Sequence, residues 1–144
     1  MSEDGGDMDV LITNNPLVEA SYSSRFKVVF LNTDLPGVLT HVRDCVHKGY
    51  VLLTHPLSGS VKPNETPYKS VLLSENSENV SLQSEASESA YPKCETDFKS
   101  VGIIEQCITA TQKFPPKHIP EEYRKDLQIV DLTLIQNAIE IHVG

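Results

Sequence analysis

Short runs of apolar, β-branched residues alternate with amphipathic stretches along the first half of the chain. Val10 to Thr13 and Phe26 to Leu31 are two such runs, and each is followed by residues that favour turns, so both predict strands. Between them, Asn15 and Pro16 are typical of a helix N-cap and of the first helical position. This pattern predicts a short helix from Pro16 to about Ser23.

A second helix is predicted from Pro36 onwards, because apolar residues return every three or four positions until Gly49. Val51 to Leu53 predicts a third strand, and Ser70 to Leu73 predicts a fourth. Strands that alternate with helices are typical of parallel sheets, whose neighbouring strands are joined by crossovers. We therefore expect an α/β fold, with a single domain over residues 10–144. Its short, mostly parallel sheet of about four strands would be flanked by helices in a Rossmann-like three-layer arrangement.

Two further helices are predicted in the last third of the chain. The first begins near Phe98 and ends near Phe114, and the second has Pro120 at its first position with two glutamates in the opening turn. Five apolar residues of the second helix, at steps of three, four and seven, predict its buried face: Tyr123, Leu127, Val130, Leu134 and Ile141.

Two segments lack any such periodicity. Residues 1–9 hold four acids and two glycines, which predicts a disordered acidic tail. Residues 74–90 hold six serines and four glutamates and no basic residue. A segment of this composition buries too little apolar surface to offset the entropy lost on ordering, so we expect a mobile surface loop.

Charge and cysteine content narrow the class of protein. Twenty acidic residues against twelve basic ones give a net charge of −8, which repels nucleic-acid phosphates and anionic lipids. No apolar run approaches the roughly 20 residues that span a bilayer. The three cysteines form no CxxC motif, and the odd count without a secretory signal favours a reducing compartment. We expect a cytoplasmic protein that binds neither nucleic acid nor membranes.

The candidate site lies beyond the carboxyl ends of the predicted strands, where open parallel sheets bind ligands. Asn14 and Asn15, Asp34 and His55 follow the first three strands, so they should converge. The segment 54–70 carries two lysines against one glutamate on an otherwise acidic molecule, and it contains three prolines. A stiff, locally cationic loop is typical of a site for a carboxylate or phosphate. The alternative is a rigid connection whose hydroxyls cap its own turns.

Complete catalytic motifs are absent. His55 with Ser58 or Ser60 could supply a base and a hydroxyl, which makes His55 the candidate catalytic residue, although no GxSxG motif frames either serine. Lys62 or Lys69 could form an imine if desolvated, but lysines beside prolines in a polar loop are usually solvated.

Known cofactor motifs are missing as well. The sequence has neither a GxxxxGK[ST] nor a GxGxxG pattern. His41 and Cys45 have the spacing of a helical metal pair, but Cys45 belongs to the apolar face and no second pair lies nearby. We expect no metal and no other cofactor.

Four strings resemble the GrdX family: ITNNPLV at 12–18, VRD at 42–44 with HKG at 47–49, LLTHPLSGSVKPNETPYKS at 52–70, and DLQIVDL at 126–132. Members of this family are small proteins of anaerobic bacteria, encoded beside the selenoprotein-dependent glycine, sarcosine, betaine or proline reductase systems. The resemblance covers most of residues 10–141. It implies a role in cytoplasmic amino-acid reduction and assigns no reaction and no catalytic residue.

Three hypotheses follow. The first is a non-catalytic accessory protein of these reductase systems that binds a small anionic metabolite or a reductase component through the loop 54–70. The second is an enzyme for a small carboxylate or phosphate compound, with His55 as acid/base and Lys62 and Lys69 as anion clamps. The third is a docking module without ligand, in which the helix 120–141 faces a partner. A homo-oligomer is compatible with each. The candidate ligand-binding residues are Asn14, Asn15, Asp34, Arg43, His55, Ser58, Gly59, Ser60, Lys62, Asn64, Glu65, Thr66, Tyr68 and Lys69.

Overall fold

The computed structural model describes residues 9–57, 66–75, 97–114 and 118–143. In chain order its elements are β1 (Val10–Thr13), α1 (Pro16–Tyr22), β2 (Lys27–Phe30), α2 (Leu35–His47), β3 (Val51–Leu52), β4 (Ser70–Ser74), α4 (Phe98–Gln112) and α5 (Glu121–Val143). The predicted tail, apart from Asp9, and the predicted loop at 74–90, apart from its first two residues, lie outside the described residues. No helix in the described ranges is long and apolar enough to cross a membrane.

The four strands form one sheet in the order β2-β1-β4-β3. β1 runs parallel to β2, whereas β4 runs antiparallel to both β1 and β3. The prediction of a mostly parallel sheet is therefore wrong. A parallel neighbour requires a crossover to the far end of the sheet, usually through a helix, and no helix lies between β3 and β4 among the described residues. The chain instead enters β4 at the same end of the sheet at which it leaves β3.

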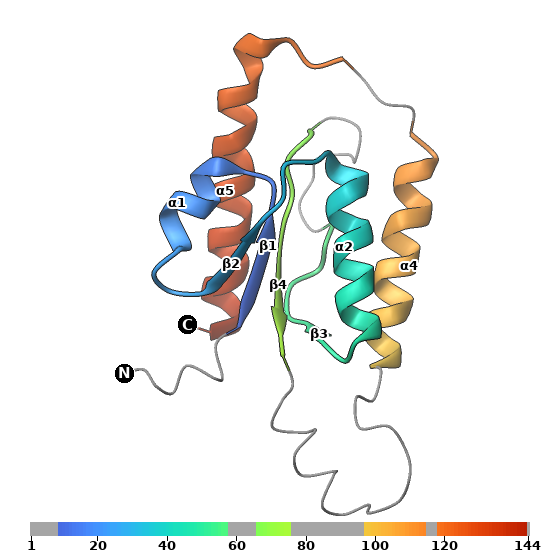
Figure 1. Ribbon diagram of the computed structural model, residues 1–144. Helices are drawn as coiled ribbons and strands as arrows, with labels where there is room; N and C mark the ends of the chain where they lie inside the picture. Colours follow the sequence, from blue (N-terminus) through green and yellow to red (C-terminus); the bar gives the residue numbers. More distant parts are fainter. Residues whose placement is uncertain (1–8, 58–65, 76–96, 115–117, 144) are drawn as a thin grey trace, which may run out of the picture.

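The helices cover both faces of this sheet, with α1 and α5 on one side and α2 and α4 on the other (Figure 1). Three layers are thus present, but they enclose a mixed sheet rather than the parallel sheet of a Rossmann-like fold. Alternate strand residues supply the two cores. Leu11 and Leu72 pack with α1 and α5, whereas Ile12 and Val71 pack with α2 and α4.

Side-chain caps begin the first two helices. The Asn15 side chain accepts a hydrogen bond from the Leu17 amide at 3.0 Å with Pro16 at the first turn, which confirms the predicted N-cap. Asp34 caps α2 in the same way by accepting from the Gly37 amide at 3.0 Å. Gly49, with φ of 108°, follows the end of α2 in a conformation that favours glycine.

The predicted buried face of α5 is wrong. Tyr123, Val130 and Ile141 are 53%, 38% and 86% exposed, and the leucines between them are only half-buried. We call these five residues the outer apolar row of α5: Tyr123, Leu127, Val130, Leu134 and Ile141. The buried row is Asp131, Ile135 and Ile139, spaced by four residues. Both rows have helical periodicity, and the buried one is the row that meets Leu11 and Leu72 of the sheet.

Candidate functional site

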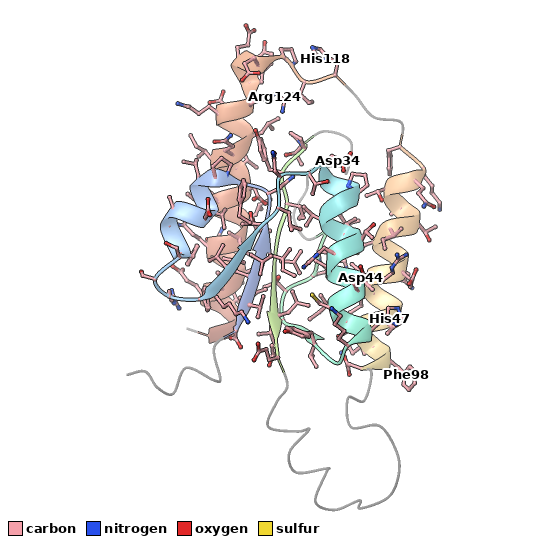
Figure 2. All side chains as sticks on the ribbon, in the orientation of Figure 1. Asp34, Asp44, His47, Phe98, His118 and Arg124 are labelled. Atoms are coloured by element: carbon pink, nitrogen blue, oxygen red, sulfur yellow. The ribbon has the colours of Figure 1, made fainter. Side chains whose placement is uncertain are left out.

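One end of the sheet is formed by the ends of β1, β2 and β3 together with the start of β4. Because β4 pairs antiparallel with both β1 and β3, the other three strands run in the same direction, and the residues that follow them lie at the same end of the sheet. Asp34 lies at this end of the molecule, whereas Asp44 and His47 lie further along α2 towards the opposite end (Figure 2). At this end of the sheet, Asn14 and Asn15 therefore lie close to the residues that precede β4.

Asn14 joins three chain segments at this end of the sheet. Its side-chain amide donates to the carbonyl oxygens of Thr33 at 2.8 Å and Pro67 at 2.7 Å. Its side-chain oxygen accepts from the Lys69 backbone amide at 2.9 Å. Both amide protons of Asn14 are thus used within the protein, and the residue positions the segment that leads into β4.

A buried carboxylate lies beside Asn14, on the α5 side of the sheet. Asp131 Oδ2 accepts hydrogen bonds from Ser70 Oγ at 2.8 Å and from the Asn15 side-chain amide at 3.0 Å. Ser70 Oγ also lies 2.7 Å from Thr13 Oγ1. The four side chains are all buried. Together they connect β1, β4 and α5 through polar contacts.

The proton positions in this network follow from its donors. The one hydroxyl proton of Ser70 goes to Asp131, since an ionised carboxylate can only accept. Thr13 must therefore donate to Ser70, and Thr13 Oγ1 accepts from the Asn15 backbone amide at 2.9 Å. Asn15 uses its second amide proton on the Gln128 carbonyl oxygen at 2.9 Å. The network is internally satisfied at Ser70, Thr13 and Asn15.

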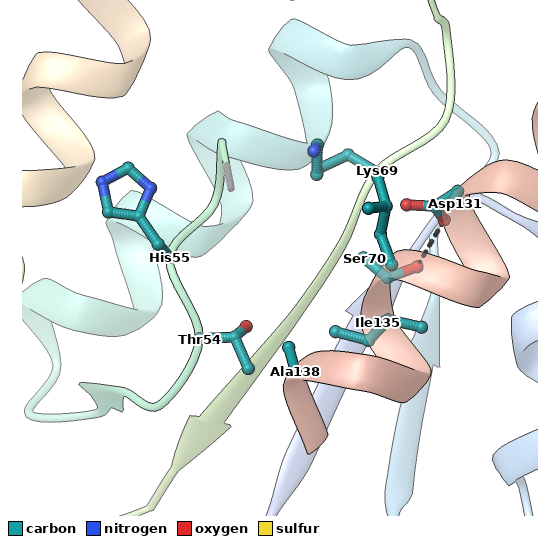
Figure 3. Close-up of a pocket in the computed structure, with 8 residues that line it drawn as sticks. Thr54, His55, Lys69, Ser70, Asp131, Ile135 and Ala138 are labelled. Carbon is teal, nitrogen blue, oxygen red and sulfur yellow. Dashed lines mark hydrogen bonds between the residues drawn. The ribbon is translucent and has the colours of Figure 1, made fainter. Parts of the chain in front are cut away.

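A small pocket borders this network. Thr54, His55, Lys69, Ser70 and Asp131 line it, and residues of α5 form its apolar wall (Figure 3). Its volume of about 10 Å³ is room for roughly one water molecule. The wall residues are Leu134, Ile135 and Ala138. The pocket is therefore polar on the strand side and narrow.

Lys69 is the unusual residue of the pocket. It is only 8% exposed, and among the described residues no hydrogen bond or ion pair reaches its ammonium group. Figure 3 shows its side chain extending away from the Asp131 carboxylate. Burial lowers the pKa of Lys69 from its usual 10.5, and the fields of Asp131 and Cys107 oppose that shift. The expectation that this lysine is solvated is wrong, because Asn14 anchors its backbone in the interior.

Three other candidate residues lie near this end of the sheet, and each makes a hydrogen bond within the protein. His55 is exposed at the rim of the pocket, and its Nδ1 accepts from the Leu57 amide at 3.1 Å. The Tyr68 hydroxyl accepts from the Gln128 side chain at 3.0 Å, and Thr66 Oγ1 accepts from the Tyr68 amide at 3.2 Å. Of these three contacts, the one between Tyr68 and Gln128 joins the candidate loop to α5, whereas the other two lie within the loop itself.

The remaining candidates are not brought to the pocket or are not described. Asp34 is occupied as the cap of α2. Arg43 lies on α2, where its Nε is 3.9 Å from Asp44 Oδ1, and it does not line the pocket. Ser58, Gly59, Ser60, Lys62, Asn64 and Glu65 lie outside the described residues. Within the described ranges, no group of three or more His, Cys, Asp or Glu side chains is arranged to hold a metal ion.

Reasoning from the sequence missed Asp131, Ser70 and Thr13 as parts of the site. The available signal was an acid four and eight residues before Ile135 and Ile139, on a row that is otherwise apolar. A buried acid on an apolar row requires polar partners, and these come from β1 and β4. Only the tertiary arrangement shows them.

Comparison with known families agrees with the resemblance in the sequence. The family model described as GrdX-like protein matches residues 10–90 and 89–140, which together span most of the chain. No curated protein and no solved structure matches the chain. The chain therefore belongs to the GrdX-like protein family.

Proposed function

We propose that this protein is an accessory component of amino-acid reductase systems and binds a small anionic metabolite at Lys69. The setting comes from the resemblance to GrdX proteins, which are encoded beside glycine, sarcosine, betaine or proline reductases. The binding role rests on one observation, the buried Lys69 ammonium without a protein counter-ion among the described residues. Lysines are almost never buried unless they are paired.

A ligand carboxylate or phosphate would complete this arrangement. Asp131 Oδ2 already accepts from Ser70 and Asn15, and no ion pair joins Asp131 to Lys69. An anion beside Nζ would offset the desolvation of the ammonium group. The pocket has room for about one water molecule, so a small anion would place one oxygen atom in it and keep its other atoms outside, and the net charge of −8 discourages polyanions.

We expect small anions to raise the melting temperature of the wild-type protein and not that of Lys69→Met. The probes are acetate, glycine, inorganic phosphate and acetyl phosphate, measured by thermal unfolding and titration calorimetry. Lys99→Met is the matched control, because Lys99 is an exposed lysine on α4. Equal stabilisation of the wild type and Lys69→Met, or no stabilisation by any probe, would contradict the proposal.

Lys69→Met is also expected to stabilise the ligand-free protein at pH 7, by about 1–3 kcal/mol. The pKa of Lys69 is lowered in the folded state, so the unfolded chain binds its proton first as the pH falls below 10.5. The wild type therefore loses stability between that value and the folded pKa, and carries the full penalty below it. Urea unfolding of both proteins should show a difference that shrinks towards pH 10. A destabilised variant at neutral pH would instead assign Lys69 a structural role.

The enzyme hypothesis gains no support from the described residues. His55 Nδ1 accepts from a backbone amide, and no described hydroxyl is bonded to the imidazole. Its proposed serine partners, Ser58 and Ser60, lie outside the described ranges. A role for His55 as acid/base stays a prediction.

A docking role has one specific observation in its favour, the exposed outer apolar row of α5. Tyr123, Val130 and Ile141 fall on one side of a helix with 3.6 residues per turn. Three exposed acids lie next to the outer apolar row, on the side away from the buried row of α5: Glu122, Asp126 and Glu140. The net charge of −8 makes two copies of the chain repel one another, so self-association is disfavoured. We propose as occupant a basic, apolar surface on a reductase component.

We expect Val130→Asp to weaken the association with purified reductase components by tenfold or more. An added carboxylate in the apolar row costs about 1–3 kcal/mol when it is buried at an interface. Gln136→Asp is the matched control, since it adds the same charge at an exposed position of α5 outside the row. Equal affinities would contradict the docking proposal. A concentration-dependent dimer in ultracentrifugation that Val130→Asp abolishes would replace the proposed partner with a second copy.

A further inference from the structure

The amine of Lys69 stands apart from the other lysines of the described chain. Lys27, for example, pairs with Glu75 at 3.6 Å on the surface, and Lys99 is exposed. The Lys69 side chain is buried beside a polar pocket, and it extends away from the only carboxylate that lines that pocket (Figure 3). The charged groups of neighbouring elements near it are Asp131 of α5, with Cys107 of α4 and His55 after β3 as titratable neighbours.

An amine in such surroundings is a nucleophile as well as a cation site. Desolvation disfavours the ammonium form, and the neutral amine carries the lone pair that attacks a carbonyl carbon. The Thr54 hydroxyl lines the same pocket as Lys69. A hydroxyl group of this kind can donate a hydrogen bond to a carbonyl oxygen.

We propose that Nζ of Lys69 forms an imine with a small aldehyde or 2-oxo acid. This inference deepens the proposed function, because the carbonyl compound would occupy the same pocket as the anion. The pocket has room for about one water molecule, so only the carbonyl group of the compound would lie inside it, and the rest of the molecule would lie outside at the rim beside the exposed His55.

The reaction balances without an oxidant or reductant. The Nζ lone pair forms a C–N bond to the carbonyl carbon, while the carbonyl oxygen gains a proton and the nitrogen loses one. The hydroxyl of this carbinolamine then takes up the remaining proton of the nitrogen, the C–O bond breaks as water leaves, and the nitrogen lone pair forms the C=N bond.

Reductive trapping of the wild-type protein tests this inference. The protein is incubated at neutral pH with glyoxylate or pyruvate and cyanoborohydride, and each lysine is followed by peptide mass spectrometry. Lys69 is expected to be alkylated faster than Lys99, since burial lowers the pKa of Lys69 and so enlarges its fraction of neutral amine. In urea the two rates should converge, because the selectivity depends on the fold. A Lys69 rate equal to or below that of Lys99 would overturn the inference, as would selectivity that survives in urea.

The anion-binding measurements separate this inference from the proposed function. If acetate and phosphate stabilise the wild type but Lys69 is not preferentially trapped, anion binding stands and the imine is rejected. If Lys69 is trapped while no anion stabilises the protein, the imine stands and anion binding is rejected. Slower trapping of Lys69 in the presence of excess acetate would support both, because the two ligands would share one pocket.

Discussion

Replacing Ile139 with alanine is expected to lower the free energy of unfolding by about 2–5 kcal/mol, the usual cost of removing a large aliphatic side chain from a core. Ile139 is fully buried and packs with Leu11, Leu72 and Ile135 between α5 and the sheet. The truncation removes apolar contacts and leaves a cavity that the surrounding strands cannot close. Urea unfolding at neutral pH measures the change.

Ile141→Ala is the matched control, since it makes the same substitution two residues further along α5. Ile141 is almost fully exposed, so its truncation should change the stability by no more than about 0.5 kcal/mol. The pair of variants therefore tests which face of α5 is buried. Equal losses, or a larger loss for Ile141→Ala, would place the outer apolar row in the core and refute the packing described above.

Replacing Asp131 with alanine is expected to cost about 2–4 kcal/mol. The substitution removes the acceptor for Ser70 Oγ and for the Asn15 side-chain amide, which leaves two buried donors without their partner. Asn15 also caps α1, so a shift of its side chain weakens the start of that helix. Urea unfolding and amide hydrogen exchange over α1 would measure both effects.

Asp126→Ala serves as the control for Asp131→Ala. Asp126 is exposed on the same helix, so its loss should stay within about 0.5 kcal/mol. If Asp131→Ala proved as mild as Asp126→Ala, the buried network would contribute little to stability. In that case water entering the neighbouring pocket would have replaced the lost carboxylate.

The two buried charged residues near this end of the sheet differ in their expected contribution to the free energy of unfolding. Asp131 is bonded by donors from two elements, and its removal should destabilise the protein. Lys69 has no such partner among the described residues, and its removal should stabilise the protein. A residue whose presence lowers stability is common where the residue serves binding or catalysis. The opposite signs expected for Asp131→Ala and Lys69→Met therefore separate the architecture of the site from its proposed function.

Local patterns in the sequence predicted most of the elements correctly. β1 was predicted at its observed bounds, and α1 began at the predicted position. Asn15 combined with Pro16 marks a helix start for reasons within three residues of chain, the free amides of the first turn and the fixed φ of proline. Predictions of this kind do not depend on what the element later contacts.

Two features could not be determined from the sequence, because each depends on which distant segment an element contacts: the buried face of α5, which was predicted wrongly, and the direction of β4, which was left open. The outer apolar row of α5 and its buried row have the same periodicity, and the sequence alone contains no measure of which one meets the sheet. The direction of β4 could not be read from its apolar run either, since parallel and antiparallel buried strands have similar composition. Both choices depend on residues far away in the chain, such as Leu11 and Leu72 for α5.

The sequence by itself determined the approximate positions of the strands and helices, the cap that starts α1, the acidic charge of the molecule and the family to which it belongs. Only the tertiary structure decided that Lys69 is buried, that Asp131 is its nearest carboxylate in the pocket, and that α5 leaves an apolar row exposed. The physical reason is the separation along the chain over which each effect acts. Capping and turn formation involve neighbours in the chain, whereas burial and desolvation depend on which distant segments pack against a side chain.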